Sequence, residues 1–164
     1  MEESEKAKRR AMYLIGSRDY GEKELYDKLR KNYSEETAAE VTALMRELGY
    51  IDDRKYADKL ARKYIEVKKY GKSRALAELR LKGIDSGIIE ETLGKYSDED
   101  LVSAAAEILR KKYTESIFDS GDEGKKELQK AVASLARRGF GWSDIKEALY
   151  IVRDELENEE TEEE

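Results

Sequence analysis

The chain has 164 residues, of which 39% are hydrophobic and 43% charged, so it can bury a core but is far more charged than a typical globular domain. It contains no proline, no cysteine and no histidine. These absences exclude disulfides and thiolate metal sites, and they remove the usual general base at neutral pH and the commonest zinc ligand. Because the helix formers Ala, Leu, Glu, Lys and Arg dominate, the composition predicts an all-α protein, and we expect no cofactor.

The net charge of −6 is unevenly distributed along the chain. Residues 154–164 hold eight acids and no Lys or Arg, and without them 32 basic residues stand against 30 acidic ones. The acidity is therefore mainly a property of the C-terminal tail, and it does not exclude an anionic partner for the rest of the chain.

No apolar run approaches the roughly 18 residues of a membrane span. The acidic residues 1–5 also lack the basic-then-apolar pattern of a secretion signal. We therefore expect a cytoplasmic protein without a membrane partner.

The first third of the chain predicts three helices, because apolar residues recur at helical spacing over residues 5–17, over residues 22–31 and from Ser34 onward. Ser34 is a good N-cap and is followed by two glutamates, which favour the positive end of a helix. Gly49 fits the left-handed position that ends a helix.

The pattern then restarts for a second round. Asp52 and Asp53 can cap a helix, and a break follows at Tyr70-Gly71. A short helix stops at Gly83, and another covers residues 86–95.

The third round begins at Ser97, and its link over residues 114–124 is longer and looser than its counterparts. The following helix stops at Gly139, and the last helix starts at Ser143. The sequence thus predicts about nine helical segments.

The rounds repeat in residues as well as in period. Tyr20-Gly21 and Tyr70-Gly71 precede matching apolar positions at the same spacing, and residues 79–84 resemble residues 135–140. A period near 45–50 residues indicates tandem three-helix modules, which stack into an elongated, curved array. The predicted boundaries are repeats at 1–50, 51–96 and 97–156, followed by an acidic disordered tail at 157–164.

Four motifs, in order and at matching spacing, resemble the RecX family over about residues 8–153. They are Glu24-Leu25 with Lys28-Leu29, residues 49–53 followed by Tyr56-Ala57, residues 76–84, and residues 135–140. The acidic extension after Asp154 and the link at 114–124 match nothing in the family core.

The resemblance implies three tandem three-helix repeats, no catalytic activity and binding in the groove of a RecA filament on DNA; we expect the chain to be a monomer. It further implies inhibition of the ATP hydrolysis, strand exchange and co-protease action of RecA, and so modulation of recombination, DNA repair and the SOS response. The residues themselves contain no phosphate loop, nucleophile elbow or metal-ligand cluster. The competing hypothesis is a helix-turn-helix-like protein that binds DNA without RecA.

The candidate partner contacts are a basic cluster in the middle repeat and a basic pair near the C-terminus. Between Val67 and Gly83 the only acid is Glu78, against six basic residues. Such a cluster is either a solvated face or a patch that meets an acidic RecA surface or, weakly, the DNA backbone; the C-terminal pair is also explained by the helix dipole. The candidate residues are Arg62, Lys63, Lys68, Lys69, Lys72, Arg74, Arg80, Lys82, Arg137 and Arg138.

Two further features have competing interpretations. Asp52 and Asp53 form either a metal or acid–base dyad or, more simply, a helix cap. Phe140 and Trp142 are expected to be buried anchors for the last helix, with an exposed interface tryptophan as the alternative. Among the eleven tyrosines most are expected to pack, and one or two could stack on nucleic-acid bases.

Overall fold

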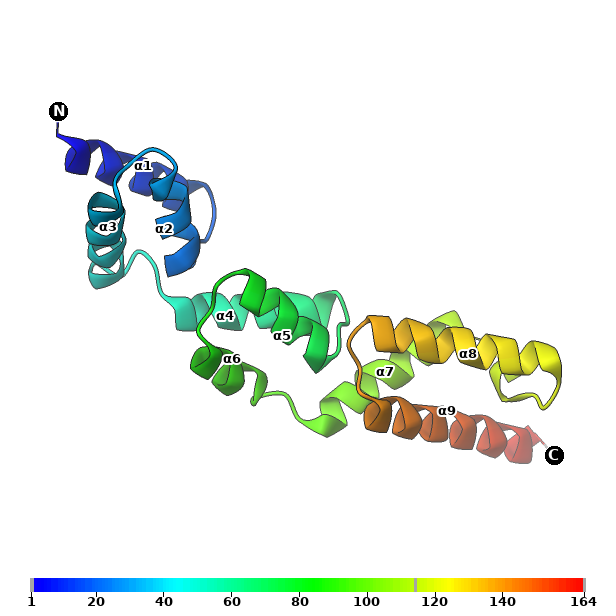
Figure 1. The fold of residues 1–164 in the computed structure, drawn as a ribbon. Helices are drawn as coiled ribbons and strands as arrows, with labels where there is room; N and C mark the ends of the chain where they lie inside the picture. Colours follow the sequence, from blue (N-terminus) through cyan, green and yellow to red (C-terminus); the bar gives the residue numbers. More distant parts are fainter. Residues whose placement is uncertain (1, 114, 164) are drawn as a thin grey trace. The chain divides into compact units, whose positions relative to one another are not determined.

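The computed structural model describes residues 2–113 and 115–163, and this part of the chain is helical throughout, without a strand (Figure 1). The predicted all-α fold is confirmed. The elements are α1 (Glu3–Ser17), α2 (Glu22–Arg30), α3 (Glu35–Glu47), α4 (Asp53–Ala61), the π-helix η1 (Arg62–Val67), α5 (Lys72–Leu81), α6 (Ser86–Leu93), α7 (Asp98–Lys112), the 3₁₀ helix η2 (Glu115–Phe118), α8 (Asp122–Arg137) and α9 (Trp142–Glu163).

The predicted helix ends are present as hydrogen bonds and dihedral angles. The side chains of Ser34, Asp52 and Ser97 each accept a backbone N–H from two or three residues further on, at 3.0–3.3 Å. Gly49 and Gly83 have φ of +79° and +78°, the left-handed conformation that glycine adopts at little cost after a helix. These local signals explain where the helices begin and end.

The helices fall into two compact units. The first unit is made from Met1–Arg62 and Ala77–Thr92, and the second from Lys63–Leu76 and Leu93–Glu164. The residues of the predicted middle repeat are divided between them: α4 and nearly all of α6 belong to the first unit, η1 apart from Arg62 belongs to the second, and α5 contributes to both. The boundaries of the three repeats remain predictions.

The first unit has its main core among α1, α2 and α3. Helices α1 and α2 both pack on α3, and their apolar stripes meet there. The fully buried side chains of this core include Ala7, Ala11, Leu25, Leu29, Ala38 and Val41.

The second unit has its main core among α7, α8 and α9. Helix α7 packs along α9, and η2 packs on α8. Ile117 of η2 is only 2% exposed, so the link that the sequence predicts to be loose is ordered by a buried side chain; Thr114 lies outside the described residues. Phe140 is buried in this core as predicted, but Trp142 is 62% exposed, so the prediction of a buried anchor is wrong for Trp142.

The C-terminal end differs from the disordered tail predicted from residue 157, because α9 continues to Glu163. Arg153 and Glu157 form an ion pair at 3.4 Å, and the backbone carbonyl of Glu157 accepts a hydrogen bond from the Thr161 hydroxyl at 2.9 Å. Glutamate is a good helix former, so these local contacts sustain a helix whose last residues are all exposed.

Candidate functional site

In the second unit, the loop before α5 lies directly against the loop after α8. The backbone N–H of Gly71 donates to the carbonyl of Arg138 at 2.7 Å, and that of Ser73 donates to the carbonyl of Gly139 at 3.2 Å. A Cβ on Gly71 would lie 2.4 Å from backbone atoms of Gly139, so only glycine allows this approach. We call this contact, between residues 68–74 and 137–140, the second joint.

The second joint fixes two arginines through backbone carbonyls. Arg138 donates from Nη1 to the carbonyl oxygens of Lys68 at 2.9 Å and Lys69 at 3.4 Å. Arg74 donates from Nη1 to the carbonyl of Arg137 at 3.4 Å. A carbonyl orients a guanidinium without cancelling its charge, so these bonds hold the cations in place and leave them positive.

Tyr70 forms the aromatic centre of the second joint. The Arg74 guanidinium lies 4.2 Å from the centroid of the Tyr70 ring, and Lys68 Nζ lies 5.8 Å from it. The Tyr64 ring stacks on Tyr70 with centroids 6.2 Å apart and an interplanar angle of 17°. The ring therefore supports its neighbouring cations by cation–π attraction.

These residues surround a cavity of about 440 Å³, which we call the cationic pocket. Four of its six lining side chains are basic, and none of those that the structure describes is acidic; the six are Lys68, Tyr70, Arg74, Ser134, Arg137 and Arg138. The structure thus brings together two groups of predicted contacts that lie more than 60 residues apart in the chain.

The first unit contains the corresponding contact, which we call the first joint, between residues 18–24 and 82–84. A Cβ on Gly83 would lie 2.4 Å from the side chain of Lys23. Glu24 lies three residues after Gly21 in the first joint, and Arg74 lies three residues after the equivalent Gly71 in the second joint. Glu24 pairs with Arg18 at 3.1 Å and with Lys82 at 3.8 Å.

The first joint carries no net charge, because residues 18–24 and 82–84 hold three basic and three acidic side chains. Burial lowers the pKa of Arg18, but its hydrogen bond to Glu24 and the charge of that carboxylate outweigh this, so the pKa is raised. The Arg18 guanidinium lies 3.7 Å from the centroid of the Tyr20 ring, as Arg74 lies over Tyr70. Both joints bring a helix-ending glycine close to the facing loop and place an arginine beside a tyrosine ring, but only the second one lacks a carboxylate at the position of Glu24.

The remaining predicted contacts lie outside the cationic pocket. Lys69 pairs with Glu107 at 3.7 Å, and Lys72 donates to the carbonyl of Tyr96 at 3.1 Å. Lys63 is exposed and is the first residue of the second unit. Three of the predicted contacts belong to the first unit, and one of them is Lys82, which pairs with Glu24. The other two in the first unit are Arg62 and Arg80, both exposed.

Asp52 and Asp53 cap two different helices. Asp52 caps its own helix, α4, whereas Asp53 Oδ1 accepts the backbone N–H of Glu22 at 2.8 Å, at the start of α2. Burial raises the pKa of the Asp53 carboxyl despite this hydrogen bond. The cap interpretation is confirmed for Asp52, and the described residues contain no group of three or more acidic, Cys or His side chains placed to hold a metal ion.

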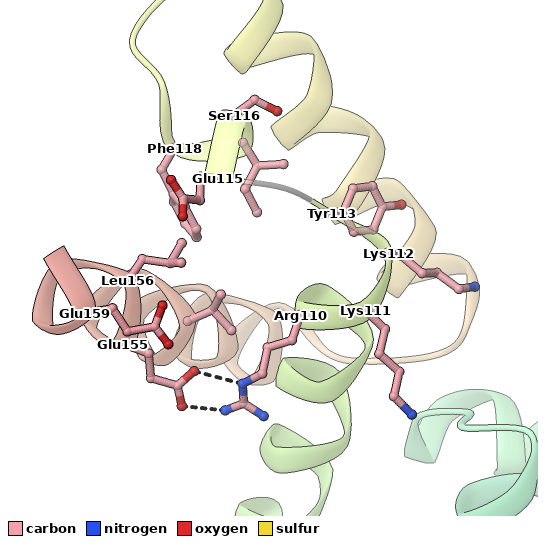
Figure 2. Close-up of a pocket in the computed structure, with 12 residues that line it drawn as sticks. Arg110, Lys111, Lys112, Tyr113, Glu115, Ser116, Phe118, Glu155, Leu156 and Glu159 are labelled. Carbon is pink, nitrogen blue, oxygen red and sulfur yellow. Dashed lines mark hydrogen bonds and ion pairs between the residues drawn. The ribbon is translucent and has the colours of Figure 1, made fainter. Parts of the chain in front are cut away.

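A larger cavity, of about 700 Å³, lies in the second unit beside the end of α7, η2 and α9 (Figure 2). Arg110 makes two hydrogen bonds to the Glu155 carboxylate, at 2.8 and 2.6 Å, and this contact lowers the pKa of Glu155. Phe118 and Leu156 supply apolar lining. Because the charged rim is partly neutralised by its own ion pairs, this cavity is less suited to an anionic partner than the cationic pocket.

Within the part of the chain that the structure describes, no helix combines the length and the apolar character needed to cross a bilayer.

Comparisons with known proteins place this architecture in one family. The models for the first, second and third three-helix domains of RecX match residues 7–43, 52–93 and 98–149. The regulatory protein RecX of Chlorobaculum tepidum is 32% identical over 143 residues, which cover 87% of this chain and 85% of the relative. That of Chlorobium phaeobacteroides is 35% identical over 140 residues, which cover 85% and 88% of the two chains.

Solved structures agree on the fold. The crystal structure of RecX from Lactobacillus salivarius superposes with a TM-score of 0.82 at 24% sequence identity, covering 92% of this chain and 96% of the other. A second crystal structure of regulatory protein RecX superposes with a TM-score of 0.76 at 22% sequence identity, covering 93% of this chain and 72% of the other.

The fold and the comparisons define a regulatory protein built from three three-helix domains. The chain belongs to the RecX family.

Proposed function

We propose that this chain is a non-enzymatic, monomeric cytoplasmic regulator that binds the RecA filament on DNA and inhibits RecA. Inhibition would extend to ATP hydrolysis, strand exchange and co-protease action, and would so modulate recombination and repair. Membership of a family of regulatory proteins supports the regulatory role. The resemblance of its motifs to that family supports RecA as the partner.

The cationic pocket is the observation that carries the proposal. A RecA–DNA filament offers anionic groups, both acidic side chains and DNA phosphates, along its surface. The pocket gathers four basic side chains on a rigid backbone contact, whereas in the first joint Glu24 pairs with Arg18 and Lys82 and the joint has no net charge. The second joint is therefore the part of the molecule best prepared to meet such a surface.

Among the predicted contacts, the structure favours Lys68 and Arg137 over the others for a charge-reversal test. Both side chains are exposed and line the pocket, so substitutions there should leave the fold intact. Lys69 forms an ion pair with Glu107, and Lys72 donates a hydrogen bond to the carbonyl of Tyr96. Reversing the charge at these two lysines would therefore disturb structural contacts.

Co-sedimentation with RecA assembled on single-stranded DNA tests the proposal, with RecA alone and DNA alone as controls. The parent chain should sediment with the RecA–DNA filament more tightly than with either component. The variant K68E/R137E should lose most of this binding. The matched control K125E/K126E, which changes the net charge equally near the other end of α8, should keep it.

The alternative function, direct DNA binding without RecA, predicts a different result. The parent would bind DNA alone as tightly as the filament and would leave RecA activity unchanged. That outcome would replace the proposed regulator with a DNA-binding helical protein.

A further inference from the structure

The cationic pocket presents hydrogen-bond donors that the protein itself does not use. Arg138 binds backbone carbonyls only through Nη1, so its Nε and Nη2 donors have no partner within the described residues. The exposed Arg137 guanidinium lines the same pocket with no hydrogen-bond or ion-pair partner in the described part of the chain. Lys68 also lines it, and within the described residues its ammonium group contacts only the Tyr70 ring.

Three such cations around one cavity exceed the charge of a single carboxylate. A guanidinium presents a planar fork of donors that matches two oxygens of one phosphate. The Ser134 hydroxyl, which also lines the pocket, is a further donor of the kind found on phosphate oxygens. A nucleic-acid strand carries adjacent phosphates, which supply both the negative charge and the hydrogen-bond acceptors that the basic side chains of the cationic pocket lack.

The pocket offers no free aromatic face to read a base. The Tyr70 ring is occupied by Arg74 and by the stacked Tyr64 ring. Contact with a nucleic acid here would therefore be to the backbone and independent of base sequence.

We infer that the cationic pocket binds the phosphate backbone of a nucleic acid, through Lys68, Arg137 and Arg138. The inference rests on the proposed function in that it takes this pocket as the contact with the filament, and it assigns the contact to the DNA strand rather than to RecA carboxylates. The first joint provides the internal contrast, because Glu24 at the position of Arg74 would repel a phosphate there.

The test is binding of a fluorescein-labelled oligothymidine to the full chain without RecA, followed by fluorescence anisotropy over a range of salt concentrations. The slope of log K against log salt is negative, and for single strands each lost phosphate contact reduces its steepness by about 0.7. The variant R137A should lose about this much slope, K68A/R137A about twice as much, and R137K should retain the parental slope. The control K125A/K126A should behave as the parent.

The inference is overturned if R137A and K68A/R137A keep the parental slope. It is also overturned if inorganic phosphate, at constant ionic strength, displaces the oligonucleotide as well as unlabelled oligothymidine does, because the pocket would then be a site for free anions. An oligonucleotide of mixed sequence should bind with the same slope, and a strong sequence preference would contradict a backbone contact.

Measuring RecA's ATP hydrolysis with the same variants separates this inference from the proposed function. If R137A weakens inhibition of RecA but keeps its DNA binding, the pocket meets a protein surface, so the inference fails and the proposed function stands. If the parent binds DNA through the pocket and has no effect on RecA, the inference stands and the proposed function fails.

Discussion

The substitution of Gly71 by alanine tests the second joint most sharply. The added Cβ would lie 2.4 Å from the carbonyl carbon and oxygen of Gly139 and from the backbone nitrogen of Phe140, where ordinary contact begins near 3.4 Å. The two backbone segments must therefore separate by about 1 Å. Because all the atoms involved belong to the backbone, no side chain can rotate away to relieve the clash.

The magnitude follows from the contacts that this separation removes. Overpacking of a tight contact costs about 1–3 kcal/mol, and each of the two backbone hydrogen bonds, Gly71 to Arg138 and Ser73 to Gly139, contributes a further 0.5–1.5 kcal/mol or so. G71A should therefore destabilise the second unit by about 2–6 kcal/mol. A chain of this length loses roughly 2–4 °C of melting temperature per kcal/mol.

Thermal denaturation and amide hydrogen exchange together measure the effect. G71A should melt several degrees lower, and the amide of Ser73 should lose its protection from exchange. The matched control is G16A, because no atom lies within 4 Å of a Cβ at Gly16 and alanine is favoured in a helix. If G71A and G16A melt alike and Ser73 stays protected, the account of the second joint is wrong.

Three further predictions concern the core, an ion pair and the C-terminal helix. Leu135 is fully buried, so L135A should cost about 2–5 kcal/mol by urea denaturation, whereas L81A, at a residue 82% exposed, should cost almost nothing; equal midpoints would show that the core is misassigned. The hydrogen bond from Arg110 lowers the pKa of Glu155 below the ordinary glutamate value of 4.5. The ion pair therefore stabilises the folded protein at pH values above 4.5, and this stabilisation is lost as the pH falls through the lowered pKa of the folded state. Since both side chains are more than 40% exposed, E155Q should differ from the parent by at most about 1 kcal/mol at pH 7 and not at all near pH 2; a difference that persists in acid would contradict the assignment. Truncation after Glu157 removes side chains that, over the described residues 158–163, are all exposed, so the melting temperature should hold, and a drop of many degrees would show that this segment packs.

The helices and their ends were predictable because their causes are local. The caps at Ser34, Asp52 and Ser97 and the left-handed Gly83 depend on residues within one helical turn, and the sequence shows them directly. The same holds for the apolar stripes that form the cores.

The cationic pocket was only partly predictable, because it depends on contacts between distant residues. The sequence identifies the basic residues near Tyr70 and near Gly139, but not that Gly71 and Gly139 meet. The signal was present in the repeated Tyr-Gly and basic-Gly motifs, since Lys82-Gly83 and Arg138-Gly139 are equivalent positions of successive repeats. Comparing Glu24 with Arg74 at matched positions would have pointed to the difference in charge between the joints.

Trp142 and the C-terminal segment differ from the sequence-based predictions, the first because of tertiary packing and the second because of local contacts within α9. The sequence around Trp142, a tryptophan that follows a glycine turn, does not indicate whether its ring faces the core or the solvent. The packing of α9 on α7 leaves this ring exposed. The acidic run satisfies the composition of a disordered tail, yet it continues a helix that begins in the core and is sustained by Arg153 and Glu157.

The most direct test of the central claim is the rate of ATP hydrolysis by RecA on single-stranded DNA, measured against the concentration of the parent chain, of K68E/R137E and of K125E/K126E. The account predicts that the parent and K125E/K126E inhibit hydrolysis at the same concentrations. It predicts that K68E/R137E, with an unchanged helical signal and melting temperature, inhibits only at much higher concentrations. Equal inhibition by all three chains, or inhibition by none, would contradict it.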